Sequence, residues 1–334
     1  MLYKKLGDRH VQCLLCAHSC KIAPGKRGIC GVRENRDGML YSLVYGMVIA
    51  ENVDPIEKKP LFHIFPGSRS LSIATVGCNF QCSFCQNHEI SQLPRERGNI
   101  IGRETKPETI VERAVKTGSK TIAYTYTEPT IFFEFAYDVA KMARENNIKN
   151  VFVSNGYMTE AGLETIAPYL DAANVDLKSF TDAFYKKYCG ARLQPVLDSL
   201  KKMKELGIWL EVTTLIIPTL NDSDDELREI ARFICSLGSE TPWHISRFHP
   251  QYQLNHLPPT PLHTIHKAEK IGKAAGLKYV YTGNVPGDQG ENTYCPVCGN
   301  LLIDRLGFHI SRIDLEGSAC PNCGNPLDGI IHVQ

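Results

Sequence analysis

The stretch LSIATVGCNFQCSFC, residues 71–85, decides how this sequence folds. Residues 71–76 are typical of a buried strand, and Cys78, Cys82 and Cys85 follow directly with C-x3-C-x2-C spacing. Three thiolates suit three irons of a 4Fe–4S cluster, and the missing fourth protein ligand leaves one iron open for a substrate. The alternative is a zinc knuckle, or an electron-transfer cluster with its fourth ligand elsewhere. The position directly after a strand favours a catalytic cluster.

Strands and helices alternate outward from this motif. Predicted strands cover residues 71–76, 121–126, 150–153, 172–177, 209–217, 243–248 and 279–281. Predicted helices cover residues 107–118, 131–147, 159–170, 195–207, 223–237 and 261–276. Repeated β-α units indicate a parallel sheet with right-handed crossovers, so the fold class is α/β. We expect a full or partial parallel β/α barrel, TIM-like, with the active site at the carboxyl ends of its strands.

Polar residues gather where the predicted strands end, as a barrel enzyme requires. In chain order they include Cys78, Thr127, Glu128, Ser154, Asn155, Asp176, Lys178, Asn221 and His244. One polar residue at a loop start is weak support, but six strand ends together favour a site at this edge of the sheet.

The net charge and the absence of long apolar segments limit the classes of protein to which this sequence can belong. Lys and Arg total 37 and Asp and Glu total 36, so bulk electrostatics favours neither nucleic acid nor an anionic membrane. The amino terminus has no apolar signal region, and no stretch of 18 apolar residues occurs. We expect a cytoplasmic protein that binds no nucleic acid and no membrane.

The thirteen cysteines fall mostly into three tight groups, which in a reducing compartment indicate metal sites rather than disulfides. Cys295, Cys298, Cys320 and Cys323 form two C-P-x-C-G knuckles, the pattern of a zinc ribbon. Cys13, Cys16, Cys20 and Cys30 could bind zinc or a second, auxiliary iron–sulfur cluster, and the common use of closed four-thiolate sites slightly favours zinc. Cys189 and Cys235 stand apart and are expected to be ordinary thiols.

These groups suggest three parts. Residues 1–45 would form a four-cysteine metal-binding segment, residues 46–287 the barrel, and residues 288–334 the zinc ribbon.

The cysteine motif, with Phe84 before its last cysteine, resembles that of the radical S-adenosylmethionine (SAM) superfamily. The resemblance covers residues 70–285. It implies that SAM binds the open iron of the 4Fe–4S cluster, and that one electron cleaves it to a 5′-deoxyadenosyl radical. That radical abstracts hydrogen from a substrate. A low-potential donor of the flavodoxin or ferredoxin type is then expected.

Within the superfamily the closest likeness is to the glycyl-radical-enzyme activases. Glu128, preceded by Thr127, matches the carboxylate that holds the SAM amino group, although it could simply cap the helix that follows. VSNG at residues 153–156 keeps the asparagine and glycine of the activase motif, with Val153 in place of an acid. This implies cofactor contacts from Ser154 and Asn155, but puts a cation site near the SAM carboxylate in doubt.

Three further positions are carried over from the same resemblance. DLK at residues 176–178 is intact, and Asp176 and Lys178 point to the same side of their strand. They are the candidate catalytic pair and also cofactor contacts, with a structural ion pair as the alternative. His244 matches a histidine that contacts the SAM ribose, and Ile217 a segment that packs on adenine. Either could instead be plain core.

Four further motifs resemble the radical SAM member of the AmmeMemoRadiSam system over nearly the whole chain. They are CLLCAHSC at 13–20, GICGVREN at 28–35, YTYTEPT at 124–130 and YTGNVPG at 281–287. This resemblance implies Memo-like and AMMECR1-like proteins as partners.

Three functions are compatible with these patterns. The favoured one is a radical SAM enzyme that acts on a protein or peptide. A glycyl-radical-enzyme activase, of the pyruvate formate-lyase activating type, is the alternative within the superfamily. A metal-stapled scaffold without catalysis is the alternative of another class, and alanine at Cys82 would separate it from the two enzymes.

Overall fold

The computed structural model describes residues 2–331 and centres on a nine-stranded sheet. Its order is β14-β13-β12-β11-β10-β9-β7-β6-β8. The strands are β6 (Met47–Pro55), β7 (Arg69–Thr75), β8 (Arg103–Glu104), β9 (Thr121–Tyr124), β10 (Lys149–Ser154), β11 (Ala172–Asp176), β12 (Trp209–Ile216), β13 (Trp243–Arg247) and β14 (Val280–Gly283). All neighbours from β7 to β14 are parallel, which confirms the predicted α/β fold.

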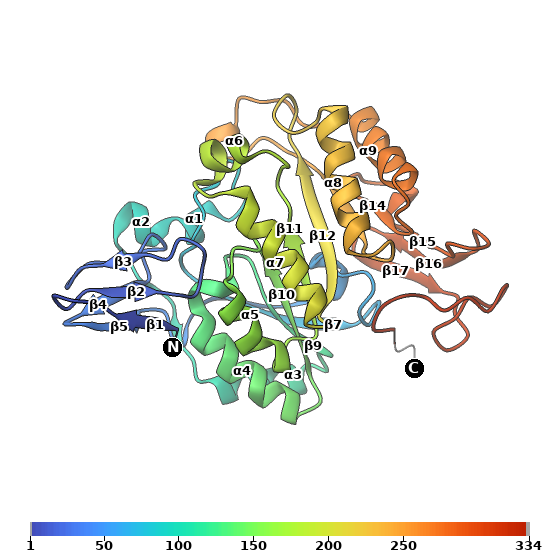
Figure 1. Cartoon of the computed structure of the whole chain (residues 1–334). Coiled ribbons are helices and arrows are strands. Elements are labelled where there is room, and N and C mark those ends of the chain that lie inside the picture. The colour runs from blue at the N-terminus through green and yellow to red at the C-terminus, as the bar shows by residue number, and fades with distance from the viewer. Residues whose placement is uncertain (1, 332–334) are drawn as a thin grey trace.

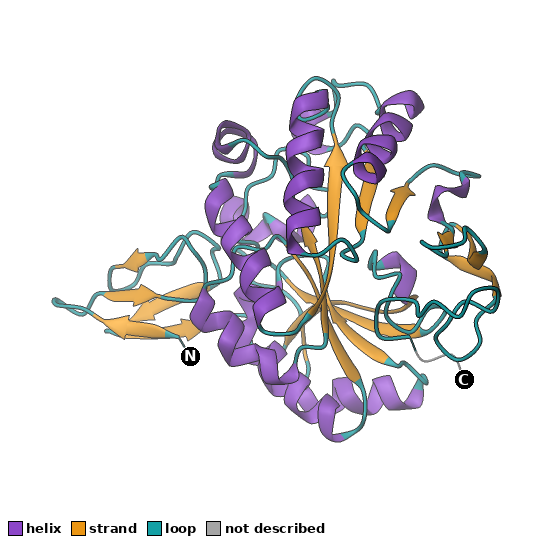
Figure 2. Cartoon of the chain, turned by 45° about the vertical axis from the view of Figure 1, so that its right-hand side comes forward, coloured by secondary structure: helices purple, strands orange, loops and turns teal. Residues whose placement is uncertain are grey.

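Helices lie along the outer face of the sheet, and Figure 2 shows them around the fan of strands. They are α3 (Pro107–Lys116), α4 (Phe133–Glu145), α5 (Glu160–Ile166), α7 (Leu193–Glu205), α8 (Asp224–Leu237) and α9 (Leu262–Ala274). Each predicted helix is found, with ends shifted by a few residues. Thr159 caps α5, because its hydroxyl accepts from the backbone N–H of Gly162. The buried positions of α8 recur at helical spacing, so one face packs inward.

The barrel is partial. Within the described residues the sheet ends at β14 on one side and at β8 on the other, so it is open. The strands β6 and β8 run antiparallel to their neighbours, which the expectation of a parallel sheet missed. The segment between β6 and β7 contacts the barrel strand β11, where the carbonyl of Pro60 accepts a hydrogen bond from the Asn174 side chain.

A small all-β module precedes the barrel, at the left of Figure 1. It contains β1 (Tyr3–Lys5), β2 (Val11–Cys13), β3 (Lys21–Ile22), β4 (Arg33–Arg36) and β5 (Met39–Ser42). Arg33 is buried and pairs with Glu134 of α4 at 2.6 Å. Backbone hydrogen bonds from Ala17 to Tyr157 and from Thr159 to Leu15 hold the module on the barrel.

A second all-β module follows the barrel, at the right of Figure 1. It contains β15 (Thr293–Tyr294), β16 (Leu301–Leu306) and β17 (His309–Ile313), paired antiparallel. Leu302 and Ile303 share a buried cluster with Phe62 and Tyr281 of the barrel. The ribbon and the barrel therefore share a core.

The remaining elements are short. They are α1 (His88–Ser91), α2 (Leu93–Arg97), α6 (Asp182–Phe184), a π-helical turn (Tyr185–Cys189), and 3-10 turns at Ile56–Lys58, Pro129–Phe132, Ala167–Tyr169, Tyr252–Leu254 and Gln289–Glu291. No helix within residues 2–331 has both the length and the apolar character needed to cross a bilayer.

Candidate active site

The three-cysteine loop lies directly beyond the carboxyl end of β7. Cys82 is buried, and the thiols of Cys78 and Cys85 are half-buried. The backbone N–H of Phe80 points at the Cys78 sulfur over 3.4 Å, and Cys85 contacts the Ser91 hydroxyl at 3.2 Å. N–H and O–H groups directed at sulfur are suited to stabilise thiolates bound to iron.

The electrostatics of this loop fits a cluster. Burial raises the pKa of Cys78 and of Cys85, and contact with Cys189 followed by burial raises the pKa of Cys82. Such thiols are neutral when free and need a cationic partner to ionise. The buried side-chain nitrogen of Asn79, in the same loop, has no hydrogen-bond partner within the described chain. The donor set and this free polar group fit a bound cluster with an open iron.

Glu128 gathers the ends of two neighbouring strands beside Cys78. The carboxylate is fully buried and accepts from the backbone N–H of Thr130, from the Ser154 hydroxyl at 2.9 Å and from the Asn155 backbone N–H at 2.8 Å. It also caps the 3-10 turn that starts at Pro129, which was the alternative role. Burial raises its pKa.

Ser154 and Asn155 bind this carboxylate, whereas Thr127 bonds the end of β7. The Asn155 side chain donates to Asn79 at 2.7 Å and to the Cys78 sulfur at 3.8 Å, so it connects β10 to the cysteine loop. The Thr127 hydroxyl donates to the carbonyl of Thr75, the last residue of β7. The structure therefore joins three of the predicted cofactor-binding residues, Glu128, Ser154 and Asn155, in one hydrogen-bonded group with Cys78. Their contacts with SAM stay predictions.

Asp176 and Lys178 form an ion pair of 2.8 Å at the end of β11. Burial alone would lower the pKa of Lys178, but the Asp176 carboxylate and the nearby Cys82 sulfur raise it well above its ordinary value. The ammonium also lies 5.7 Å from the centre of the Phe84 ring. The pair is thus placed at the cysteine loop, and its catalytic role stays a prediction.

His244 and Ile217 lie apart from this group. The His244 ring bonds the Glu211 carboxylate at 2.6 Å, and that carboxylate also accepts from the backbone N–H groups of Phe62 and His63. Ile217 is fully buried just after β12, with its N–H bonded to Asn221. No contact joins either side chain to the cysteine loop among the hydrogen bonds of residues 2–331, and their roles toward SAM stay predictions.

No sequence pattern indicated the position of Cys189, which was expected to be an ordinary thiol. This residue is buried in the π-helical turn, contacts Cys82, and its carbonyl accepts from the Gln81 N–H at 2.8 Å. More than a hundred residues separate the two cysteines, so spacing could not have paired them.

The C-terminal cysteines form a compact cage. The sulfurs of Cys295, Cys298, Cys320 and Cys323 all lie within 4.8 Å of one another. The cage fits one tetrahedral ion, because zinc–sulfur bonds of about 2.3 Å hold four sulfurs close together. Zinc is the expected ion and stays a proposal.

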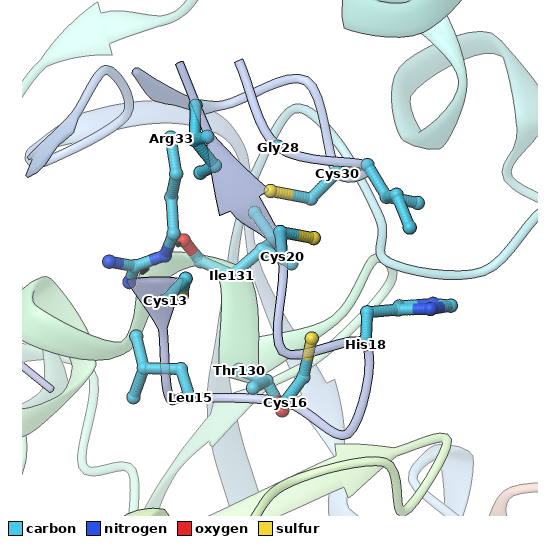
Figure 3. Close-up of a pocket in the computed structure, with 12 residues that line it drawn as sticks. Cys13, Leu15, Cys16, His18, Cys20, Gly28, Cys30, Arg33, Thr130 and Ile131 are labelled. Carbon is cyan, nitrogen blue, oxygen red and sulfur yellow. Dashed lines mark hydrogen bonds between the residues drawn. The ribbon is translucent and has the colours of Figure 1, made fainter. Parts of the chain in front are cut away.

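The N-terminal cysteines surround a cavity. Cys13, Cys16, Cys20 and Cys30 line it together with His18, Arg33, Thr130 and Ile131, as Figure 3 shows. Thr130 and Ile131 follow Glu128, so this cavity borders the region of the first site.

Comparisons with known proteins agree with this arrangement. Residues 72–234 match the radical SAM superfamily. An uncharacterized protein of Methanocaldococcus jannaschii is 49% identical over 99% of both chains. The pyruvate formate-lyase-activating enzyme of Clostridium pasteurianum is 25% identical over 51% of this chain and 70% of its own.

A solved structure agrees at the level of the fold. The radical SAM methyltransferase of Sphaerobacter thermophilus superposes with a TM-score of 0.53 over 71% of each chain, at 17% identity. This likeness shows the fold, and the family rests on the match of residues 72–234. The chain therefore carries a radical SAM superfamily domain at residues 72–234.

Proposed function

We propose that this protein cleaves SAM reductively and uses the resulting radical on a protein or peptide. The observation that carries the proposal is the convergence of Cys78, Glu128 and Asn155 within one hydrogen-bonded group. A 4Fe–4S cluster on Cys78, Cys82 and Cys85 would supply one electron to SAM, which yields methionine and a 5′-deoxyadenosyl radical that takes hydrogen from the substrate.

The protein's own residues would bind and orient SAM. Glu128 offers a carboxylate for the amino group of the methionine part, held in place by Ser154 and Asn155. Lys178 offers a cation beside Cys82 and is oriented by Asp176. Glu128, Ser154 and Asn155 are buried, which would limit the access of water to this part of the site.

The choice of a protein or peptide substrate rests on the modules at both ends of the barrel. They add cysteine-rich β-structure on opposite sides of the barrel in Figure 1, where they are suited to dock a macromolecule. Memo-like and AMMECR1-like proteins are the proposed partners, and a flavodoxin- or ferredoxin-type protein in a reducing, cytoplasmic compartment is the proposed electron donor.

Anaerobic turnover tests the proposal. The reconstituted protein, given dithionite and SAM, should release 5′-deoxyadenosine, and Cys82→Ala should lower the rate at least about 100-fold because one iron ligand is lost. Cys235→Ala, at a half-buried cysteine outside all three groups, is the matched control and should retain the rate. Release that is unaffected by Cys82→Ala would refute the proposal and leave the scaffold in its place.

A glycyl-radical-enzyme activase is the second candidate. It is favoured by Asn155 beside Cys78, by the intact pair Asp176–Lys178, and by the relative from Clostridium pasteurianum, whose name assigns it that activity. Each proposed partner protein would be incubated with the active enzyme and frozen for electron paramagnetic resonance. A glycyl doublet would select the activase, and hydrogen loss without that doublet would select another peptide modification.

A further inference from the structure

The cavity formed by Cys13, Cys16, Cys20 and Cys30 is separate from the catalytic site, and its metal is undecided by spacing. Cys13 and Cys30 are buried, while Cys16 and Cys20 are half-buried. The remaining wall is largely apolar, from Leu15, Ile22, Ile29 and Ile131. Four thiols that line one small space are the usual donor set of a structural metal site.

The spread of the sulfurs distinguishes the two candidate metals. A single zinc requires four sulfurs as close as those of the ribbon, which lie within 4.8 Å of one another. Within residues 2–331 the ribbon is the one group that is so compact, so the N-terminal cysteines are more widely spread. Cys78, Cys82 and Cys85, where the superfamily carries a 4Fe–4S cluster, do not form so compact a group either. A 4Fe–4S cluster needs larger distances between the cysteine sulfurs than a single zinc does, because each thiolate binds a different iron at a corner of the cluster.

The N-terminal cavity directly adjoins the cysteine loop of the barrel. One nitrogen of the Arg95 guanidinium donates to the carbonyls of Ile29 at 2.8 Å and of Cys78 at 3.2 Å. A Cβ on Gly77 would lie 3.3 Å from the carbonyl of Cys30. The two metal sites are thus separated by little more than one layer of backbone.

Aromatic contacts also connect the two sites. The His18 ring, in the wall of the cavity, lies 4.9 Å from the Tyr157 ring and donates to the Asn79 carbonyl at 2.8 Å. Tyr157 in turn lies 5.0 Å from Phe80, between Cys78 and Cys82. On the other side, Ile29 is 42% exposed, which brings the cavity close to the protein surface.

We propose that Cys13, Cys16, Cys20 and Cys30 hold a second 4Fe–4S cluster, which passes electrons from an external donor to the cluster on Cys78, Cys82 and Cys85. A reduced flavodoxin- or ferredoxin-type donor gives one electron to the N-terminal cluster and is oxidised by one electron. The N-terminal cluster then reduces the second cluster by one electron and returns to its oxidised state. The relay rests on the proposed function, whereas the identity of the metal does not.

The identity of the metal is tested without any SAM chemistry. The full chain carrying Cys78→Ala, Cys82→Ala and Cys85→Ala leaves the N-terminal site untouched. After anaerobic reconstitution it should hold about four iron atoms and show a reduced 4Fe–4S signal by electron paramagnetic resonance. Adding Cys298→Ser to this variant should remove zinc and leave the iron. A protein with no iron and two zinc ions would overturn the proposal.

The relay is tested with Cys16→Ala and Cys20→Ala, at the two half-buried ligands. Each should lose about four of eight irons and slow reduction of the remaining cluster by a reduced flavodoxin at least tenfold, while the Kd for SAM stays within about twofold of wild type. An unchanged reduction rate would overturn the relay. A Kd for SAM that weakens in parallel would also overturn it, since that would indicate a merely structural site. If wild type is reduced normally but releases no 5′-deoxyadenosine, the proposed function fails and the second cluster stands.

Discussion

At the scale of the residue, His63 shows how one buried group is fixed in one protonation state. One ring nitrogen donates to the carbonyl of Asp328 at 2.7 Å, and the other contacts the Tyr281 hydroxyl at 2.7 Å. Burial lowers the pKa of His63 to about 4. The neutral ring therefore bridges the barrel residue Tyr281 and Asp328 of the ribbon.

This lowered pKa predicts a loss of stability in acid. Because the folded pKa is about 4 and the unfolded pKa about 6.5, the unfolded chain binds the proton first as the pH falls. Protonation of His63 therefore leaves the free energy of unfolding unchanged above pH 7. Between pH 6.5 and 4 it lowers that free energy by about 3 kcal/mol. Urea unfolding across this range measures the effect.

The control isolates His63 from the other titrating groups. His63→Gln should be less stable at pH 7 but should have a shallower pH dependence between 6.5 and 4. His256→Gln, at an exposed histidine, should follow wild type. Equal slopes in wild type and His63→Gln would contradict the assignment.

At the scale of the element, the turn between β7 and the cysteine loop holds the N-terminal module against the barrel. Gly77 has φ of 103°, and a Cβ there would lie 2.7 Å from Val32 as well as close to Cys30. A side chain at this position is therefore excluded both by backbone conformation and by the neighbouring segment.

Gly77→Ala should thus weaken the packing of the N-terminal module against the barrel. We expect it to lower the free energy of unfolding by about 2 kcal/mol more than Gly118→Ala, because of overpacking. Gly118 is the matched control, since its φ is also positive at 65° and a Cβ there meets nothing within 4 Å. Chemical denaturation of both variants gives the difference, and equal losses would show that only the backbone conformation matters.

At the scale of the whole molecule, the C-terminal ribbon packs against the barrel and shares a buried cluster with it. Arg305 of β16 donates to the carbonyl of Phe62 at 3.0 Å and to the Thr293 hydroxyl at 2.6 Å, and its guanidinium lies 4.3 Å from the Phe62 ring centre. Because this buried arginine and the shared core connect the two parts, they should unfold together.

Loss of the ribbon's metal should therefore destabilise the barrel. Cys298→Ser, at an exposed ligand, should release one zinc per chain and lower the free energy of unfolding by about 2 kcal/mol or more, a few degrees in Tm. Cys235→Ser should change neither. Zinc analysis and circular dichroism check both effects, and an unmoved barrel transition after zinc loss would contradict the coupling.

The sequence alone determined the alternation of strands and helices and the place of the cysteine motif. Period and composition are local properties, so every predicted strand and helix from residue 71 to residue 281 was found, and Cys78, Glu128 and Asn155 were assigned to neighbouring strand ends before their contacts were known. The antiparallel strand β6 was missed because its pairing with β7 depends on partners distant in the chain.

Only the tertiary structure decided which of these residues meet. It joined Glu128 to Asn155, brought Cys189 to Cys82, paired His244 with Glu211, and set the N-terminal cysteines beside Gly77. The physical reason is that such contacts arise from the packing of elements far apart in sequence, where shape, burial and charge act together. Residue spacing carries no record of them.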